Sequence, residues 1–222
     1  MRVREIAGPA GPLDALLDEP PQTGGVNAEG LVEQGQAEGL RAAVVLAHPH
    51  PQYGGTMHTK VLYQSAKAFS RIGCAVLRFN FRGAGTSAGE FDQGRGEMDD
   101  FRTALSFMHE RYPGTPLWAA GMSFGAWIAL SVGAADPRVS TLVGIAPPVS
   151  RYDFGPVRVS AKPKFFVQGE RDEMCPLVEM QQFYARAADP KELVVIDAAD
   201  HLFDGKLSEV ADAIEDLLGD WS

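Results

Sequence analysis

Gly121-Met122-Ser123-Phe124-Gly125 lies between an apolar run that reads as a strand, Pro116 to Ala120, and a run that reads as a helix, Ala126 to Leu130. A serine at the tip of such a sharp turn has strained backbone, and glycines two residues before and after it prevent Cβ clashes with the strand and the helix. The helix N-terminus also directs free N–H groups and a positive dipole end toward the serine oxygen. The pentapeptide therefore predicts a nucleophile elbow with Ser123 as the nucleophile.

A serine nucleophile needs a base and an acid that orients the base, and both follow Ser123 in the chain order that such an elbow requires. The strand expected at Lys164 to Gln168 ends in a carboxylate-rich turn that contains Asp172. The next expected strand, Glu192 to Ile196, is followed by a loop with His201 and then by the final helix. We therefore predict a catalytic triad of Ser123, Asp172 and His201.

Other carboxylates compete with Asp172 for the role of the acid. Glu170 and Glu173 belong to the same turn and are rivals on sequence grounds. Asp200 adjoins His201 and is the weaker rival, because a neighbour in the chain rarely turns its carboxylate back onto the ring. An aspartate in such a turn is by itself usually a solvated residue or a helix cap, so the order of the three residues carries the prediction.

The oxyanion of the reaction needs two backbone N–H donors. One comes from the residue after the nucleophile, Phe124, and the other from the loop after the third strand. That loop, residues 48–55, carries prolines at positions 49 and 51, which have no N–H. Three donors remain in it, those of His50, Gln52 and Tyr53, and we favour His50.

Histidines and cysteines raise the question of a metal site or a disulfide. His48, His50 and His58 are closely spaced, but the alternating prolines and the lack of an adjacent acidic ligand argue against a metal. Cys74 lies in an apolar strand and Cys175 lies three residues after Asp172, which does not indicate a disulfide framework. We expect neither a metal nor a cofactor.

Three motifs together carry a resemblance to a known family. They are His48-Pro49-His50-Pro51 with Gly54-Gly55, then Phe79-Asn80-Phe81-Arg82-Gly83-Ala84-Gly85 with Ser87 and Gly89, and then Gly121-Met122-Ser123-Phe124-Gly125. From about Arg41 onward, the chain resembles the small, lidless α/β-hydrolases related to dienelactone hydrolase. The resemblance implies the α/β-hydrolase fold and the triad of Ser123, Asp172 and His201. Dienelactone hydrolase has a cysteine nucleophile where this chain has serine, so lactone specificity does not carry over.

Composition and charge limit the classes of function. The chain has 222 residues, of which 45% are apolar and 22% charged, which suits one domain with a sizeable core. A net charge of -9 without a basic cluster argues against nucleic acid or an anionic membrane as a partner. The first residues do not read as a leader, and no apolar run approaches the roughly twenty residues that span a bilayer. We therefore expect a cytoplasmic protein, and the sequence leaves its oligomeric state open.

Strands and helices alternate along the chain, which predicts a mostly parallel, twisted sheet of about eight strands with helices on both faces. An opening hairpin is expected at Val3 to Ala7 and Leu13 to Leu17, and a surface loop at residues 20–40. We assign residues 1–222 to a single domain. Helices are expected at Thr59 to Ile72, Gly96 to Arg111, Phe124 to Ala134, Leu177 to Ala188 and Leu207 to Leu218.

The segment between the strands expected at Thr141 to Ile145 and Lys164 to Gln168 is too short for a lid domain. The substrate pocket should therefore be open and shallow, which favours short acyl groups. We predict that substrate contacts Tyr53, Met122, Met174, Leu202 and Phe203, and that Phe124, Tyr152 and Phe154 also border the pocket.

These patterns predict a serine carboxylester hydrolase that acts on a small-molecule acyl ester through an acyl-enzyme intermediate. A thioesterase or a small-peptide hydrolase would use the same residues. The alternative from another class is a non-catalytic binding protein on a hydrolase fold. Such proteins typically lose or bury part of the triad, whereas this chain carries all three members.

Overall fold

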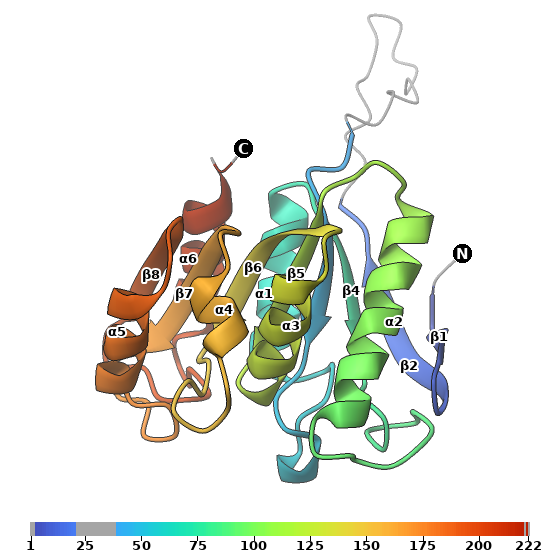
Figure 1. The fold of residues 1–222 in the computed structure, drawn as a ribbon, viewed down its shortest axis with the longest axis horizontal. Helices are drawn as coiled ribbons and strands as arrows, with labels where there is room; N and C mark the ends of the chain where they lie inside the picture. The colour runs from blue at the N-terminus through green and yellow to red at the C-terminus, as the bar shows by residue number, and fades with distance from the viewer. Residues whose placement is uncertain (1–2, 21–38, 220, 222) are drawn as a thin grey trace, which may run out of the picture.

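The computed structural model describes residues 3–20, 39–219 and 221, and within these ranges eight strands form one sheet (Figure 1). The strand order is β1-β2-β4-β3-β5-β6-β7-β8. β1 (Glu5–Gly8) and β2 (Gly11–Asp18) form the predicted opening hairpin, and β2 pairs antiparallel with β4 (Ala75–Phe79). All later neighbours pair in parallel, so the predicted mostly parallel sheet is confirmed.

The central strands are buried on both faces. The remaining strands are β3 (Ala43–Ala47), β5 (Leu117–Met122), β6 (Val139–Ile145), β7 (Lys164–Gly169) and β8 (Lys191–Ile196). Every residue of β3, β4, β5 and β7 is buried, which explains why these strands are mostly apolar and do not alternate, with Arg78, Lys164 and Gln168 as the polar exceptions.

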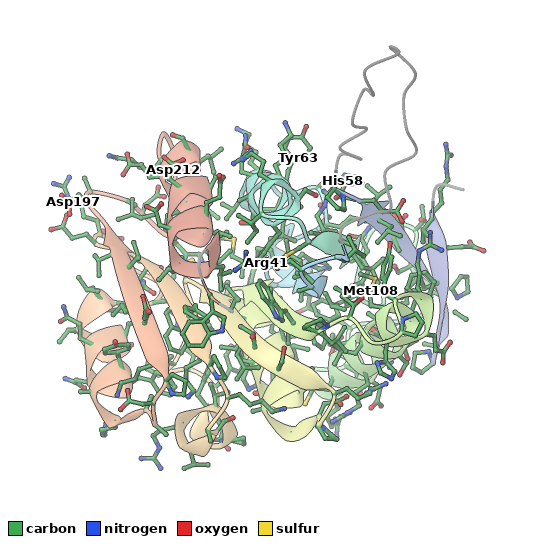
Figure 2. The ribbon with its side chains drawn as sticks, turned by 90° about the horizontal axis from the view of Figure 1, so that it is seen from above. Arg41, His58, Tyr63, Met108, Asp197 and Asp212 are labelled. Carbon is green, nitrogen blue, oxygen red and sulfur yellow. The ribbon has the colours of Figure 1, made fainter. Side chains whose placement is uncertain are left out.

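Helices cover the two faces of the sheet in two layers. α1 (Lys60–Arg71) and α6 (Leu207–Gly219) pack on one face, with Tyr63 and Asp212 on that side in Figure 2. The other face carries α2 (Arg95–Arg111), α3 (Phe124–Ala135), α4 (Gly155–Val159) and α5 (Leu177–Arg186). α6 buries residues 210, 214, 217 and 218, which share one face at helical spacing.

The five helices expected from the sequence are confirmed within two residues at each end. Two short elements were not predicted, namely α4 and the 3₁₀ turn η1 (Pro51–Tyr53). Most of the loop expected at residues 20–40 lies outside the described residues, and the assignment of the chain to one domain stays a prediction. Among the described residues, no helix combines the length and the apolar character needed to cross a membrane.

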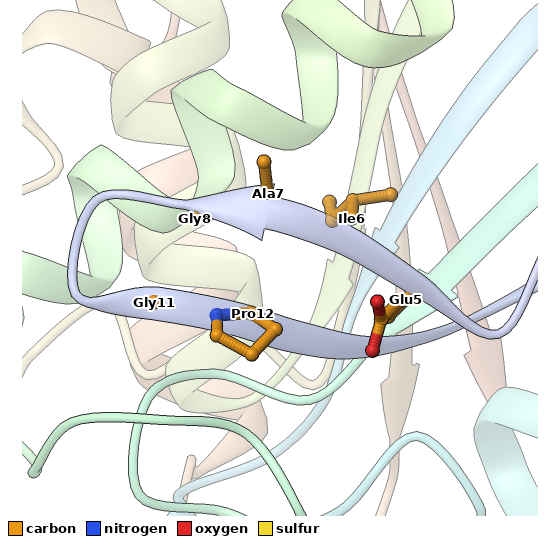
Figure 3. A pocket seen from close by; sticks show the side chains of 6 residues that line it. All are labelled: Glu5, Ile6, Ala7, Gly8, Gly11 and Pro12. Atoms are coloured by element: carbon orange, nitrogen blue, oxygen red, sulfur yellow. The ribbon is translucent and has the colours of Figure 1, made fainter.

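Two features of the fold bear on the position of the site. Residues 146–163 join β6 to β7 and contain only the five residues of α4 as regular structure, so no lid domain is present there. A hollow of about 360 Å³ lies at the opening hairpin and is lined by Glu5, Ile6, Ala7, Gly8, Gly11 and Pro12 (Figure 3). None of the residues predicted for the site lines that hollow.

Candidate active site

Ser123 lies at the sharp turn between β5 and α3 with φ 54° and ψ -123°, a conformation that is strained for a residue with a side chain. Its N–H donates to the carbonyl of Ile145, and its own carbonyl accepts the N–H of Ala126 and Trp127. A Cβ on Gly121 would lie 2.3 Å from the carbonyl oxygen of Gly125. The backbone therefore approaches itself so closely at this turn that the motif requires glycine.

A chain of hydrogen bonds joins the three residues predicted as the triad. The distance from Ser123 Oγ to His201 Nε2 is 2.9 Å, and the distance from His201 Nδ1 to Asp172 Oδ2 is 2.8 Å. Because a carboxylate only accepts, Nδ1 carries the proton and Nε2 is free to accept the hydroxyl proton of Ser123. All three side chains are buried, yet Ser123 and His201 each keep 8% of their surface exposed.

Three donors besides His201 hold the Asp172 carboxylate in place. Its Oδ1 accepts the backbone N–H groups of Met174 at 2.9 Å and Cys175 at 2.7 Å. Its Oδ2 accepts Nε2 of Gln168 at 3.1 Å, beside the bond from His201. Sequence reasoning missed Gln168, although a polar residue near the end of an apolar strand and next to the acid's turn was a usable signal.

The rival acids do not contact the histidine ring. Glu170 accepts the N–H of Ala198 at 2.8 Å, and Asp200 accepts the N–H groups of Leu202 and Asp204. Glu173 is exposed. Of the candidates, the structure therefore brings Asp172 to the ring.

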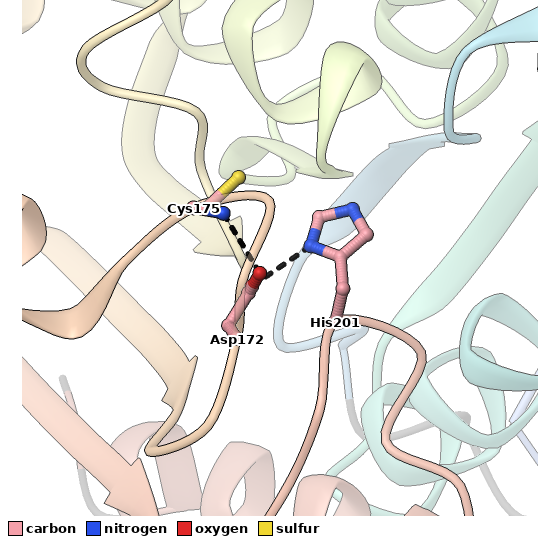
Figure 4. Close-up of side chains that lie close together, drawn as sticks. All are labelled: Asp172, Cys175 and His201. Carbon is pink, nitrogen blue, oxygen red and sulfur yellow. Dashed lines mark hydrogen bonds and ion pairs between the residues drawn. The ribbon is translucent and has the colours of Figure 1, made fainter.

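Asp172, Cys175 and His201 each offer a ligand atom within 4.8 Å of the others, a spacing that a metal ion could use (Figure 4). The chemistry of the donors does not fit a metal well. Burial, with the charge of Asp172 as a second cause, raises the pKa of the Cys175 thiol to about 12, and Oδ1 of Asp172 already accepts two backbone N–H groups. The other two residues already bond to each other through Nδ1 and Oδ2, as the triad requires.

His48 fixes the loop that follows β3. Its Nδ1 donates to the carbonyl of Pro49 at 2.5 Å, and its Nε2 accepts the N–H of Phe81 at 3.0 Å. The side chain is fully buried, and burial lowers its pKa to about 4. His48 is therefore a neutral ring: its Nδ1 bonds within the loop, and its Nε2 ties the loop to Phe81 after β4.

Two of the three candidate N–H donors in this loop are already used. The N–H of Gln52 donates to the ring Nδ1 of His50, and the N–H of Tyr53 donates to the carbonyl of His50. Neither the N–H of His50 nor that of Phe124 has an acceptor among the described residues. This arrangement supports His50 and Phe124 as the pair of oxyanion donors.

The predicted pocket residues divide into two groups. Tyr53, Met174 and Leu202 are exposed by 82%, 44% and 53%, so their side chains are accessible to a substrate. Met122 and Phe203 are fully buried in the core beneath α1 and α6, so the prediction that they contact substrate is wrong. Phe154 is 3% exposed and packs in the core on the other face of the sheet, the core that also contains Phe124, so its role as a pocket border stays a prediction.

The chain is similar to a known protein family and to a curated protein. The family model described as serine aminopeptidase, S33, matches residues 38–159. An uncharacterized protein of Rickettsia prowazekii is 35% identical over 199 residues, which cover 86% of this chain and 83% of that protein.

Two solved structures are similar over almost their whole length. An α/β serine hydrolase homologue from Coxiella burnetii has a TM-score of 0.85 and 34% identity, covering 96% of this chain and 95% of that one. An α/β serine hydrolase without lid from Xanthomonas campestris has a TM-score of 0.86 and 33% identity, covering 100% of this chain and 94% of that one. These likenesses confirm the predicted fold, and they agree with the lack of a lid between β6 and β7 in the described part of the chain.

Proposed function

This chain belongs to the serine aminopeptidase S33 family of α/β serine hydrolases, and we propose that it is a carboxylesterase that hydrolyses short-chain acyl esters through an acyl-enzyme. The observation that carries the proposal is the continuous hydrogen-bond chain from Ser123 through His201 to Asp172, which starts at a strained elbow. This arrangement supplies an activated hydroxyl in a partly exposed position.

Each residue has one role in the proposed reaction. His201 takes the hydroxyl proton as Ser123 Oγ attacks the ester carbonyl, and Asp172 holds Nδ1–H and stabilises the charged ring. The N–H groups of Phe124 and His50 stabilise the oxyanion of the tetrahedral intermediate. His201 then gives its proton to the leaving alkoxide, and water repeats the sequence to release the acid.

Substrate size follows from the surroundings of the triad. The segment from β6 to β7 carries no lid, and three side chains at the predicted substrate site, those of Tyr53, Met174 and Leu202, are open to solvent. A site of this shape covers a short acyl group and leaves a long one in water. We therefore favour small esters as substrates.

A small-peptide hydrolase is the second candidate, because the family's description is that of an aminopeptidase. An aminopeptidase has to bind the free amine of its substrate, and a carboxylate commonly does so. Burial lowers the pKa of His50, and the charge of the Glu97 carboxylate opposes that shift. Glu97 is fully buried and already accepts the N–H groups of Asp92 and Gly94. Glu97 is thus engaged elsewhere and does not offer an amine-binding carboxylate.

Labelling with a fluorophosphonate tests the proposal. We expect a covalent adduct on Ser123 of the wild-type protein and none on Ser123→Ala. A panel of acetyl and butyryl esters, the matching thioesters and aminoacyl amides then separates the candidates, and we expect the oxygen esters to be hydrolysed fastest. A folded wild-type protein that takes up no probe would exclude a serine hydrolase mechanism, and a preference for the amides would exclude the esterase.

A further inference from the structure

We propose that this site takes esters that carry an aromatic ring, which lies against an aromatic wall formed by Tyr53, His50, Phe91, Phe124, Trp127 and Tyr152. The inference rests on the proposed esterase function and names the substrate class within it. The ring could belong to the acyl group or to the alcohol, and the recognising chemistry is the same for both.

The aromatic wall is built around Phe124, the residue directly after the nucleophile. The centroid of its ring lies 4.8 Å from that of His50 and 5.8 Å from that of Phe91. On its other side it lies 5.6 Å from Trp127 and 6.0 Å from Tyr152. These tilted and edge-to-face contacts are those that aromatic rings prefer, so the wall is a packed array that begins at the nucleophile.

The outer rings of the wall are open to solvent, unlike those of an ordinary aromatic core. Phe124 is 2% exposed, whereas His50, Phe91, Trp127 and Tyr152 are all partly exposed. Tyr53 is 82% exposed and its ring lies 4.7 Å from that of His50. Exposed aromatic surface that adjoins a nucleophile marks a place for an apolar ligand.

Tyr152 extends the wall beyond Phe124. Its ring stacks on that of Trp127 at 4.2 Å with an interplanar angle of 12°, and its centroid lies 6.0 Å from that of Phe124. The two stacked rings therefore adjoin the residue that follows the nucleophile.

The Trp127 ring of the wall is packed in place. A Cβ on Gly94, where φ is +98°, would lie 2.4 Å from the Trp127 ring, so this glycine makes room for the indole. A rigid aromatic ring loses little conformational freedom when it lies on such a surface, whereas a flexible alkyl chain loses more. A half-open wall therefore favours a planar ring over an alkyl chain of equal size.

Two matched pairs of esters test the inference. Phenylacetyl and cyclohexylacetyl esters of one alcohol test an aromatic acyl group, and benzyl and cyclohexylmethyl acetates test an aromatic alcohol. A methylene separates the ring from the ester in each compound, and division by the alkaline hydrolysis rate removes the remaining difference in reactivity. We expect kcat/KM to favour the aromatic member of at least one pair by about two- to tenfold, the range of an aromatic side-chain pair.

Three tyrosine variants locate the preference. Tyr152→Leu and Tyr53→Leu remove an aromatic ring but keep an apolar side chain, and both should bring the aromatic-to-cyclohexyl ratio toward one. The matched control is Tyr63→Leu, whose tyrosine is 45% exposed on α1 and lies outside the wall, and its ratio should equal that of the wild type. Because Tyr53 is so exposed, Tyr53→Leu should fold even if Tyr152→Leu does not. A thermal unfolding curve of each variant shows whether it is folded.

The outcomes separate this inference from the function on which it rests. Hydrolysis of all four esters without an aromatic preference would overturn the aromatic wall as a substrate site and leave the esterase standing. A preference that survives in folded Tyr53→Leu and Tyr152→Leu would also overturn it. If none of the esters is hydrolysed and Ser123 takes up no fluorophosphonate, the esterase proposal fails and the inference fails with it.

Discussion

Ser123 has a positive φ of 54° that its neighbours impose, and alanine tolerates this conformation as well as serine does. Ser123→Ala therefore removes Oγ with little effect on the fold. We expect ester turnover to fall by about 10⁴- to 10⁶-fold, the range seen when a triad nucleophile is removed. Steady-state kinetics and a thermal unfolding curve measure the two effects, and near wild-type turnover would remove Ser123 from the mechanism.

The bonds of Asp172 make a specific prediction for Asp172→Asn. Two backbone N–H groups hold the Oδ1 position, so the amide nitrogen of asparagine has to take the position of Oδ2, facing His201 Nδ1. A donor there leaves the proton on Nε2, where the ring can no longer accept from Ser123. We expect kcat to fall by about 10⁴-fold, as in a serine protease triad.

Glu170→Gln and Glu173→Gln are matched controls for Asp172→Asn, because each replaces one carboxylate of the same turn by an amide. Neither side chain contacts the ring, so both variants should keep kcat close to that of the wild type. If one of them lost activity as Asp172→Asn is expected to, that glutamate would be the acid.

His48 makes stability depend on pH in a defined window. Burial lowers its pKa to about 4 in the folded protein, whereas the unfolded chain has the ordinary value near 6.5. Between these values the unfolded chain binds a proton that the folded protein does not, so stability falls as the pH drops from about 6.5 toward 4. The contribution lost at pH 4 is on the order of 3 kcal/mol, and above about 6.5 it is fully retained.

Urea unfolding of the wild type and of His48→Gln between pH 4 and 7 measures this contribution. The variant should be less stable at pH 7, because Phe81 N–H and Pro49 C=O lose their partner, but its stability should fall less steeply with decreasing pH. His58→Gln replaces an exposed histidine and should keep the wild-type slope. Equal slopes for the wild type and His48→Gln would show that His48 is not held neutral.

At the scale of elements, the turn from β5 to α3 depends on its close contact with the end of β3. A Cβ on Gly125 would lie 2.4 Å from the carbonyl oxygen of His48 and 2.5 Å from that of Ala47, and backbone cannot move aside as a side chain can. We expect Gly125→Ala to cost about 1–3 kcal/mol, the usual range for overpacking. That cost lowers Tm by roughly 2–12 °C in a chain of this size.

Gly39→Ala is the control for Gly125→Ala in a thermal unfolding experiment. No described atom lies within 4 Å of a Cβ built on Gly39, so its Tm should stay near that of the wild type. Gly125→Ala should also lower activity, because it displaces the loop that offers the His50 N–H. A Tm equal to that of the wild type would mean that the elbow tolerates a shift of β3 relative to α3.

The elements that could be predicted from the sequence are those whose own pattern determines them. β3 is an apolar run of strand length, and β4 is one that only Arg78 interrupts. The helices show a buried stripe such as Phe101, Ala104, Leu105 and Met108. α4 has five residues with proline near its start, and it buries only Val157. Such a short element has no periodicity of its own and depends on packing against α3.

The hydrogen-bonded trio of Ser123, Asp172 and His201 could be predicted because its members follow β5, β7 and β8 in a fixed chain order, and the carboxyl ends of parallel strands meet at one edge. The side chains that line the pocket could not be predicted in this way. Along β5, Trp118, Ala120 and Met122 point to the face of α1 and α6, while Leu117 and Ala119 point to the other face. The sequence predicts that side chains along a strand alternate between the two faces of the sheet. It does not show which face borders the site, because that depends on the tertiary arrangement.

At the scale of the whole molecule, the residues of the site gather at one edge of the sheet. The loop of His50 follows β3, Ser123 follows β5, Asp172 follows β7 and His201 follows β8. These strands run in parallel, so their carboxyl ends share the edge at which open α/β sheets place their sites. Four loops that are distant in the sequence therefore meet at this edge, and the site is exposed to solvent there.

This openness predicts how activity depends on acyl chain length. Residues 146–163 provide only α4 beside the site, so methylenes beyond the first few stay partly in water. Each then contributes less than the roughly 0.8 kcal/mol that full burial gives. In a series of 4-nitrophenyl esters, we expect kcat/KM to peak between acetate and butyrate and to fall by decanoate, without activation at an oil–water interface. A maximum at long chains would require a cover from a second subunit or from residues outside the described ranges, and would contradict an open site.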